Sequence, residues 1–344
     1  MKARFVKYTL QFKFDAGTSR GVLKSKYTYF LILEKNEKTG IGECNLFKGL
    51  SADDRPDYEE KLRWVCDALS NNNFMVLNEL REFPSIAFGV EQAIIALGAK
   101  NEFELFPSLF THGKSNILIN GLVWMGDESF MKQQIVDKIE EGFTTIKLKI
   151  GALEFNTELN LIKKIRKQFN EDAIQLRLDA NGAFNPDEAL EKLKILSEYK
   201  IHSIEQPIPV KQWDSMASLC EKSPIGIALD EELIGVFETS KKIELLDTIK
   251  PQYIILKPSL IGGIAGSNEW IQCAAKYNTG WWVTSALESN IGLNALAQYT
   301  FNLRNSMPHG LGTGGLFTNN FESPLEVVKG HLHYNTAKKW NVNL

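Results

Sequence analysis

From residue 149 onward, charged residues recur at the ends of short apolar runs. The set comprises Lys149, Asp179, Glu205, Asp230 and Lys257. Consecutive members are roughly 25 to 30 residues apart, about the length of one β-strand with its following α-helix and loops. Because the parallel strands of one sheet end at the same edge, this spacing predicts that the five side chains converge on one site.

Three members of this set, Asp179, Glu205 and Asp230, are carboxylates. Like charges raise one another's pKa, so three converging carboxylates stay ionised only beside a cation. Oxygen ligands without cysteine or histidine favour Mg²⁺, and Mn²⁺ can replace it. The sequence therefore predicts a divalent-cation site held by these three residues.

The two lysines, Lys149 and Lys257, close the predicted strands on either side of the carboxylates. An ammonium near a divalent cation loses its proton more easily, which makes both lysines candidates for proton transfer. Strand alternation places Lys147 on the same face as Lys149 and one layer deeper, where it can lower its neighbour's pKa. Lys149, nearer the strand end, is the predicted proton-transfer residue.

Each of these residues taken alone has an ordinary structural explanation, such as a loop cap, an ion pair or a surface position. A purely structural interpretation must account for all five at successive repeats, each inside an apolar run such as residues 254–256. We therefore favour the functional interpretation.

The elements that must position these residues alternate between short β-rich runs and longer amphipathic stretches. The predicted strands are Ile117–Trp124, Thr145–Ile150, Ile174–Asp179, Ile201–Glu205, Ile225–Asp230, Tyr253–Lys257, Trp281–Ser285 and a weaker eighth near His309–Leu311. Repeated βα units favour a closed TIM-like barrel. A doubly wound open sheet is the alternative, although no G-x-G-x-x-G motif follows the first strand, which argues against dinucleotide binding.

The chain before the barrel has a different pattern. Strands are predicted within residues 5–14, 27–33 and 41–44, with a polar hairpin loop over 35–40, and helices over 57–69 and 85–99. Strands followed by helices indicate an α+β domain. We predict an α+β domain over residues 1–112, a barrel over 113–317, and a C-terminal segment, 318–344, that completes the first domain.

The composition excludes several classes of function. The net charge of −3 lacks the basic excess of a nucleic-acid-binding protein. No apolar stretch approaches the roughly 18 residues of a membrane span, and the N-terminus lacks the pattern of a signal peptide. The four cysteines have no paired spacing, so they are interpreted as buried residues in a reducing compartment. We expect a cytoplasmic enzyme with a small-molecule carboxylate substrate and no nucleic-acid or membrane partner; the oligomeric state is left open.

The strand ends also carry recognisable motifs: Thr145-x-Lys147-x-Lys149, Asp179-Ala180-Asn181-Gly182, Ile204-Glu205-Gln206-Pro207, Leu229-Asp230-Glu231 and Leu256-Lys257-Pro258. Together they resemble the successive motifs of the enolase superfamily, in its muconate-lactonizing-like branch with two barrel lysines. The resemblance covers essentially the whole chain. It implies a modified (β/α)7β TIM barrel with an α+β N-terminal capping domain, Mg²⁺ bound by the three carboxylates, and an enediolate intermediate between the two lysines.

Three further segments, 85–93, 284–292 and 309–317, are similar to segments of the o-succinylbenzoate synthase family. Members of that family are dehydratases of menaquinone biosynthesis. This similarity implies a carbon–oxygen lyase that converts 2-succinyl-6-hydroxy-2,4-cyclohexadiene-1-carboxylate to 2-succinylbenzoate by syn elimination of water. Lys149 would remove the α-proton and return it to the departing hydroxyl. Lys257 would stabilise the anionic intermediate from the other face.

Further residues are expected to support the site or bind substrate: Lys147, Asn181, Glu231, Ser285 and Arg20. Arg20 belongs to one of two loops, residues 17–21 and 46–51, that a capping domain would close over the barrel.

Two other functions remain open from the sequence. A racemase or epimerase acting on an N-acylamino acid would use the same two lysines as opposed acid and base. A barrel that keeps these ions only for stability would act as a binding module. A test for loss of water from the cyclohexadiene substrate in the presence of a divalent metal separates the three.

Overall fold

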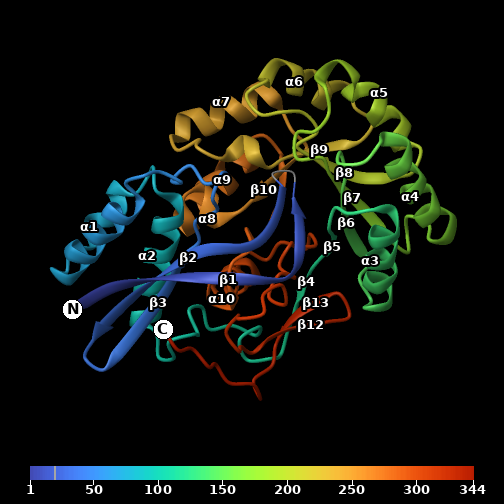
Figure 1. Cartoon of the computed structure of the whole chain (residues 1–344). Helices are drawn as coiled ribbons and strands as arrows, with labels where there is room; N and C mark the ends of the chain where they lie inside the picture. Colours follow the sequence, from blue (N-terminus) through green and yellow to red (C-terminus); the bar gives the residue numbers. More distant parts are fainter. Residues whose placement is uncertain (19–20) are drawn as a thin grey trace.

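The computed structural model describes residues 1–18 and 21–344, and of residues 15–18 only the backbone. Figure 1 shows a curved array of barrel strands and helices beside an N-terminal sheet with its own helices. We call residues 2–98, which hold that sheet and its helices, the N-terminal unit. Its elements are β1 (Lys2–Thr18), β2 (Gly21–Lys35), β3 (Lys38–Cys44), α1 (Tyr58–Ser70), the 3-10 helix η1 (Phe74–Glu79) and α2 (Pro84–Gly98).

The N-terminal sheet is antiparallel, in the order β1-β2-β3. The loop predicted over residues 35–40 is wrong in length, because strand pairing continues to Lys35 and resumes at Lys38. Asn36 and Glu37 alone make the turn, and their φ values of 49° and 62° are the left-handed conformation that two-residue hairpins require.

Helix α2 packs directly against β3. A Cβ atom on Gly42 would lie 1.9 Å from the carbonyl oxygen of Gly89, so glycine is needed for the helix to approach this closely. Cys44 lies at the same contact, and all four cysteines are free and buried, as the sequence analysis predicted.

The barrel strands are β5 (Gly121–Val123), β6 (Thr145–Lys149), β7 (Gln175–Asp179), β8 (Ile201–Glu205), β9 (Gly226–Leu229), β10 (Tyr253–Leu256) and β11 (Gly280–Val283). They form one parallel sheet in sequential order. Bridges from His309 to Ile119 and from Gly310 to Thr284 close the circle, so the weak eighth strand is present. A sequential, closed order confirms the modified TIM barrel and shows that the open-sheet alternative is wrong.

Helices follow the barrel strands in turn: α3 (Glu128–Glu140), α4 (Phe155–Gln168), α5 (Pro186–Ser197), α6 (Trp213–Lys222), the 3-10 helix η2 (Glu231–Leu233), α7 (Thr239–Ile249), α8 (Pro258–Ile261), α9 (Gly263–Lys276) and α10 (Asn290–Asn302). Their apolar faces and the outward faces of the strands share one core. None of the described helices is long and apolar enough to cross a membrane.

The stretch predicted as one first strand, residues 117–124, is two elements. β4 (Ile117–Leu118) joins β13 (His331–Tyr334) and β12 (Leu325–Val328) in a separate antiparallel sheet, and only β5 enters the barrel. Hydrophobic alternation could not separate them, because both halves are buried.

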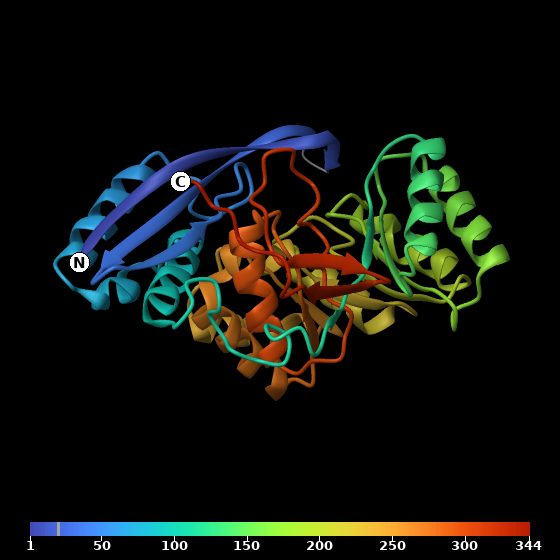
Figure 2. The ribbon, with the colours of Figure 1, turned by 90° about the horizontal axis from the view of Figure 1, so that it is seen from below.

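The C-terminal segment returns toward the N-terminal sheet, and Figure 2 shows the C-terminus close to β1 and β2. Phe321 packs with Phe30 and Ile32 of β2, and Trp340 stacks on Phe103 at a ring distance of 4.4 Å. These contacts accord with the proposed assignment of residues 318–344 to the first domain, which stays a prediction together with the boundaries at 112 and 317.

Candidate active site

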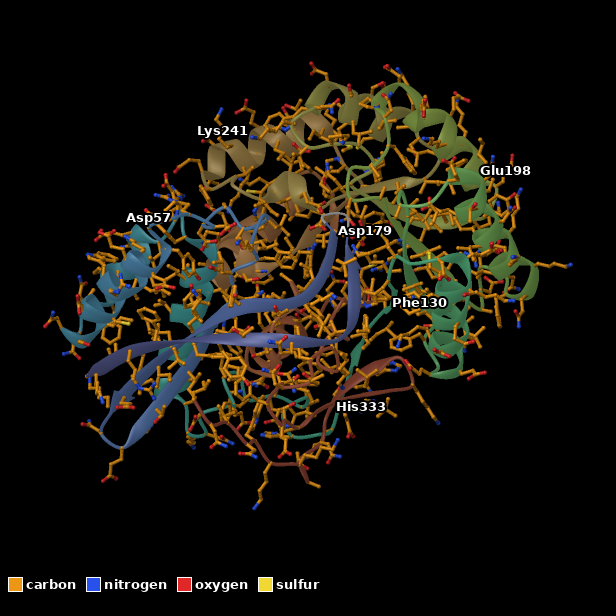
Figure 3. All side chains as sticks on the ribbon, in the orientation of Figure 1. Asp57, Phe130, Asp179, Glu198, Lys241 and His333 are labelled. Atoms are coloured by element: carbon orange, nitrogen blue, oxygen red, sulfur yellow. The ribbon has the colours of Figure 1, made fainter. Side chains whose placement is uncertain are left out.

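The strand register brings the predicted charged residues to one end of the barrel. Lys149 pairs with Asp179, and Asp179 pairs with Glu205, across three neighbouring strands. Asp230 and Lys257 follow the ends of β9 and β10. In Figure 3 Asp179 lies at the centre of the molecule, whereas the labelled charged residues Asp57, Lys241 and Glu198 lie at its edge.

The first group of ion pairs involves both lysines of β6. Lys147 Nζ contacts Glu205 Oε2 and lies 2.9 Å from Asp179 Oδ2. Lys149 Nζ lies 3.1 Å from the same Asp179 oxygen and donates a 2.7 Å hydrogen bond to Asn181 Oδ1. The two lysines therefore occupy adjacent positions along one carboxylate-lined wall, with Lys147 the deeper, as strand alternation predicted.

The second group lies across the barrel mouth. Lys257 Nζ is 2.5 Å from Asp230 Oδ2. Asn181 connects the two groups, because its Nδ2 donates a 2.9 Å hydrogen bond to Glu231 Oε1 while its Oδ1 holds Lys149. The backbone of Asn181 has a φ of 43°, which turns the chain after β7 so that the amide faces the site.

Burial and neighbouring charge have opposite effects on the pKa of Glu205, Asp179 and Lys257. Burial raises the pKa of Glu205 to about 7, against the opposing effect of Lys147. Burial would also raise the pKa of Asp179, but Lys147 and Lys149 hold it below its usual range. Burial disfavours the ammonium of Lys257, yet Asp230 raises its pKa overall. The site is an ion-pair network in which each charge depends on its neighbours.

The three carboxylates do not by themselves form a cluster with metal-binding geometry. In the described part of the chain, no group of three or more His, Cys, Asp or Glu side chains is arranged to hold a metal ion. The ammonium groups of Lys147 and Lys257 lie against the carboxylates instead. One buried oxygen, Glu205 Oε1, has no hydrogen-bond partner among the described residues. A hard cation bound there would supply the partner that this oxygen lacks.

A cavity of about 500 Å³ opens above the network. Its polar lining includes seven of the predicted site residues: Lys147, Lys149, Asp179, Asn181, Glu231, Lys257 and Ser285. Glu205 and Asp230 lie beneath this floor and are 0% and 2% exposed. Arg20, the remaining predicted residue, lies outside the described residues.

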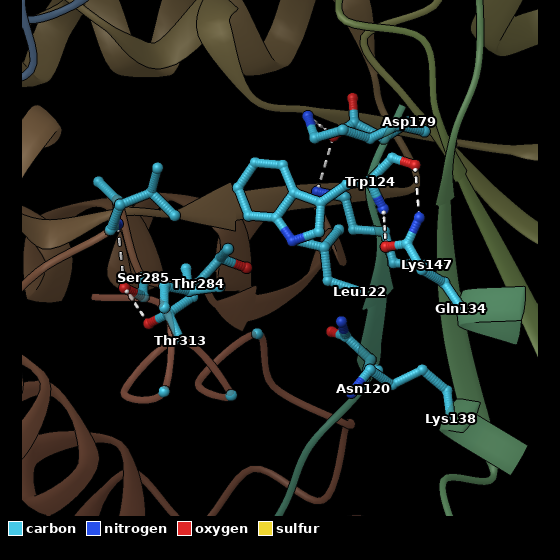
Figure 4. Close-up of a pocket in the computed structure, with 18 of the residues that line it drawn as sticks. Asn120, Leu122, Trp124, Gln134, Lys138, Lys147, Asp179, Thr284, Ser285 and Thr313 are labelled. Atoms are coloured by element: carbon cyan, nitrogen blue, oxygen red, sulfur yellow. Dashed lines mark hydrogen bonds and ion pairs between the residues drawn. The ribbon is translucent and has the colours of Figure 1, made fainter. Parts of the chain in front are cut away.

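Ser285 is held on the opposite wall by a short network. Its hydroxyl donates a 2.5 Å hydrogen bond to Glu288 Oε2 and accepts one of 2.8 Å from Thr313, as Figure 4 shows for the pair Ser285 and Thr313. The backbone N–H of Leu287 also donates to Ser285 Oγ at 3.1 Å.

The apolar wall of the cavity was not predicted. Trp124 lies at its centre in Figure 4 beside Leu122, and Phe14 of β1 contacts the indole at a ring distance of 5.9 Å. Gln134 of α3 fixes the backbone of Trp124 through two hydrogen bonds, of 2.9 Å to its N–H and 3.1 Å to its C=O. A tryptophan directly after a barrel strand was the available signal, since barrel sites are built at strand ends.

Comparison with known proteins agrees with this geometry. Residues 131–338 match the family model described as enolase C-terminal domain-like. The o-succinylbenzoate synthase of Desulfotalea psychrophila is 43% identical over 96% of this chain and 98% of its own length. The chain belongs to the o-succinylbenzoate synthase family of the enolase superfamily. The resemblance drawn from its motifs is thereby confirmed.

Two further comparisons, one with a solved structure and one with an epimerase, show how far the similarity extends. The crystal structure of MenC from Desulfotalea psychrophila LSv54 superposes with a TM-score of 0.86 at 40% identity, over 97% of this chain and 99% of that one. The L-Ala-D/L-Glu epimerase of Bacillus subtilis is 28% identical, but over only 48% of this chain and 45% of its own. Sequence similarity to the epimerase thus extends over about half the length that sequence similarity to the synthase covers.

Proposed function

We propose that this enzyme is an o-succinylbenzoate synthase, which dehydrates 2-succinyl-6-hydroxy-2,4-cyclohexadiene-1-carboxylate to 2-succinylbenzoate in menaquinone biosynthesis. The observation that carries the proposal is 43% identity to a named synthase over nearly the full length of both chains. The site fits the reaction, because Lys149 at the end of β6 and Lys257 directly after β10 lie on opposite sides of the barrel mouth with a cavity between them.

Asp179, Glu205 and Asp230 are the residues that would hold Mg²⁺, or Mn²⁺ in its place. Two observations support this assignment: a buried Glu205 oxygen has no hydrogen-bond partner among the described residues, and the donor set consists of oxygen atoms alone. A divalent cation bound there would stabilise negative charge on the carboxylate of the substrate as the α-proton leaves.

Lys149 is the proposed base and acid. Its neutral amine takes the α-proton, and the electron pair of the broken C–H bond is left on the substrate as an enediolate. The resulting ammonium then gives that proton to the departing hydroxyl, so that the C–O bond breaks and water leaves from the same face. Asn181, at 2.7 Å from Nζ, holds the amine in place for both steps.

Lys257 is the proposed electrostatic partner. Asp230 keeps its ammonium charged, as the raised pKa of Lys257 indicates. A fixed cation opposite Lys149 stabilises the anion on the substrate without taking a proton. Ser285 and the supporting groups Lys147 and Glu231 are proposed to orient the substrate and the two catalytic lysines.

The partner is therefore a small carboxylate. We place the enzyme in the cytoplasm, since four buried free cysteines suit a reducing compartment.

The test is direct. The purified protein with Mg²⁺ is incubated with the cyclohexadiene substrate, and formation of the aromatic product is followed by absorbance. Rapid conversion is expected. In parallel, deuterium exchange at the α-carbon of both enantiomers of an N-succinylamino acid is followed by NMR. If both enantiomers exchanged much faster than the substrate is dehydrated, the racemase alternative would be favoured. The partial sequence similarity to the epimerase is the reason for testing that alternative.

A further inference from the structure

Glu43, the penultimate residue of β3, reaches from the N-terminal unit to helix α10 of the barrel. Its Oε2 accepts hydrogen bonds from Ser289 Oγ at 2.6 Å and from the backbone N–H of Gly292 at 3.0 Å. The N–H of Ser289 contacts both carboxylate oxygens, at 3.1 and 3.0 Å, and Thr28 Oγ1 donates to Oε1 at 2.9 Å. This completely buried carboxylate therefore fixes the start of α10.

Glu91 of α2 makes an equivalent contact with helix α9. Its Oε2 accepts a 2.5 Å hydrogen bond from the N–H of Ile264, and its Oε1 accepts one of 2.9 Å from the N–H of Ala265. The first turn of α9 has no intrahelical partners for these N–H groups. Both oxygens of Glu91 are thus used to fix a second barrel helix.

A glycine makes room for each carboxylate. A Cβ atom on Gly263 would lie 2.2 Å from Glu91 Oε2, and one on Gly292 would lie 2.6 Å from Glu43 Oε2. Any other residue would force the glutamate away at either position. The same construction occurs twice, on two consecutive helices of the barrel.

Asn45 lies between the two contacts. Its Nδ2 is 3.2 Å from Ser259 Oγ, in the segment after Lys257, and 2.9 Å from Glu288 Oε1, in the segment after Ser285. The buried ammonium of Lys26 contacts Asn45 Oδ1 and donates a 3.0 Å hydrogen bond to the carbonyl of Leu287. The N-terminal unit therefore touches both strand-end segments at the cavity.

These segments connect site residues to the anchored helices. Lys257 is followed by α8 and then by α9, which Glu91 holds. Ser285 is followed by Ser289 and α10, which Glu43 holds. We propose that Glu43, Asn45 and Glu91 are positioning residues. Through them the N-terminal unit fixes Lys257, and also residues 284–287 of the cavity wall that hold Ser285, relative to the substrate. The proposal rests on the proposed function of the site.

The two anchors should affect different kinetic constants. Lys257 acts on the charge that develops in the transition state, so displacing it should lower kcat. The segment from Thr284 to Leu287 forms the cavity wall, so displacing it should weaken substrate binding and raise KM. Small displacements are enough, because misplacement by about 1 Å can cost up to about 100-fold in rate.

The test compares Glu91→Gln with Glu43→Gln, which preserve side-chain size. A glutamine has one acceptor oxygen, so its amide NH₂ must face an N–H donor that the glutamate satisfied. At pH 8 with saturating Mg²⁺, Glu91→Gln should lower kcat about tenfold and change KM less than twofold. Glu43→Gln should raise KM about tenfold with the smaller effect on kcat. If Glu43→Gln does not fold, Ser289→Ala replaces it.

The matched control is Gln298→Leu. Gln298 lies on α10, two turns beyond the site. Its amide NH₂ donates hydrogen bonds to Phe103 O at 2.8 Å and Asn294 Oδ1 at 2.7 Å, and its oxygen accepts one of 2.9 Å from the N–H of Phe106. Its loss should lower Tm and leave kcat and KM within twofold of the wild-type values. If the glutamine variants changed kcat and KM no more than this control does, the positioning role would be refuted.

Hydrogen–deuterium exchange gives a readout that does not depend on the reaction. Glu91→Gln should speed exchange in residues 258–265 and leave residues 286–292 unchanged, and Glu43→Gln should do the reverse. Failure of the wild-type enzyme to dehydrate the substrate would count against the proposed function alone. Unchanged exchange in both variants would count against the anchoring itself.

Discussion

Two sets of carboxylates in this molecule are paired in different ways. Asp179, Glu205 and Asp230, in the barrel, contact the ammonium groups of lysines. Glu43 and Glu91, in the N-terminal unit, accept hydrogen bonds from the first N–H groups of barrel helices.

The difference separates a reactive site from a scaffold. A lysine side chain is long and can move from its carboxylate partner to a substrate, which leaves that carboxylate to bind a metal ion, and the lysine proton can leave. A backbone N–H at the start of a helix can do neither, so a carboxylate paired with it stays in place. The barrel set is therefore suited to chemistry, and the N-terminal set to holding its geometry.

Loss of the proton-transfer lysine should give the largest effect. Lys149→Ala removes both base and acid, and each such role is worth roughly 10²- to 10⁴-fold in rate. We expect dehydration to fall by at least about 100-fold without loss of fold. Turnover of the cyclohexadiene measures the dehydration rate, and the far-UV circular dichroism spectrum shows whether the variant is folded. Lys164→Ala, at an exposed ion pair with Glu128, is the matched control and should keep full activity.

Removal of Lys257 tests the opposite side of the site. Lys257→Ala deletes a partly buried cation that faces the developing anion, and it leaves Asp230 without its 2.5 Å partner. We expect kcat to fall by about 100-fold, the scale of losing one preorganised electrostatic group. Activity close to wild type would mean that charge stabilisation comes entirely from other groups.

Metal removal tests whether the barrel carboxylates exchange partners. Excess chelator should abolish dehydration, and Mg²⁺ or Mn²⁺ should restore it. Asp230→Asn should weaken metal affinity, measured by calorimetry, by at least about 10- to 100-fold, the cost of losing even an outer contact of a metal site. Glu91→Gln should bind the metal normally, since Glu91 is not a proposed ligand and its carboxylate accepts hydrogen bonds from the backbone N–H groups of Ile264 and Ala265. Full activity in excess chelator would contradict the proposed cation site.

The smallest predicted effect concerns stability. Burial raises the pKa of Glu91 from 4.5 to about 7, against the opposing hydrogen bonds from Ala265 and Ile264. The folded protein therefore holds this proton more tightly than the unfolded chain, and its free energy of unfolding should fall as pH rises from about 4.5 to 7. The contribution is on the order of 1–3 kcal/mol. Urea unfolding at pH 5 and pH 8 should show it in the wild type, and Glu91→Gln should lose it.

Several features could be predicted because they follow from local periodicity. The alternation of β-rich and amphipathic runs gave the barrel strands to within a few residues, since each strand is apolar on the face toward the helices. Lys149, Asp179 and Lys257 could be assigned to one site because parallel strands end at the same edge. The errors, at residues 35–40 and 117–124, occurred where turn conformation and partner choice override hydrophobic pattern.

The sequence by itself determined the barrel, its charged strand ends and the chemistry that those charges can perform. Only the tertiary structure decided which lysine contacts which carboxylate, that Trp124 forms the apolar wall, and that Glu43 and Glu91 anchor helices far along the chain. The physical reason is the distance along the sequence between the residues that interact. Strand period and apolar alternation repeat every few residues and are legible locally, whereas a contact between residues 91 and 264 leaves no pattern near either of them.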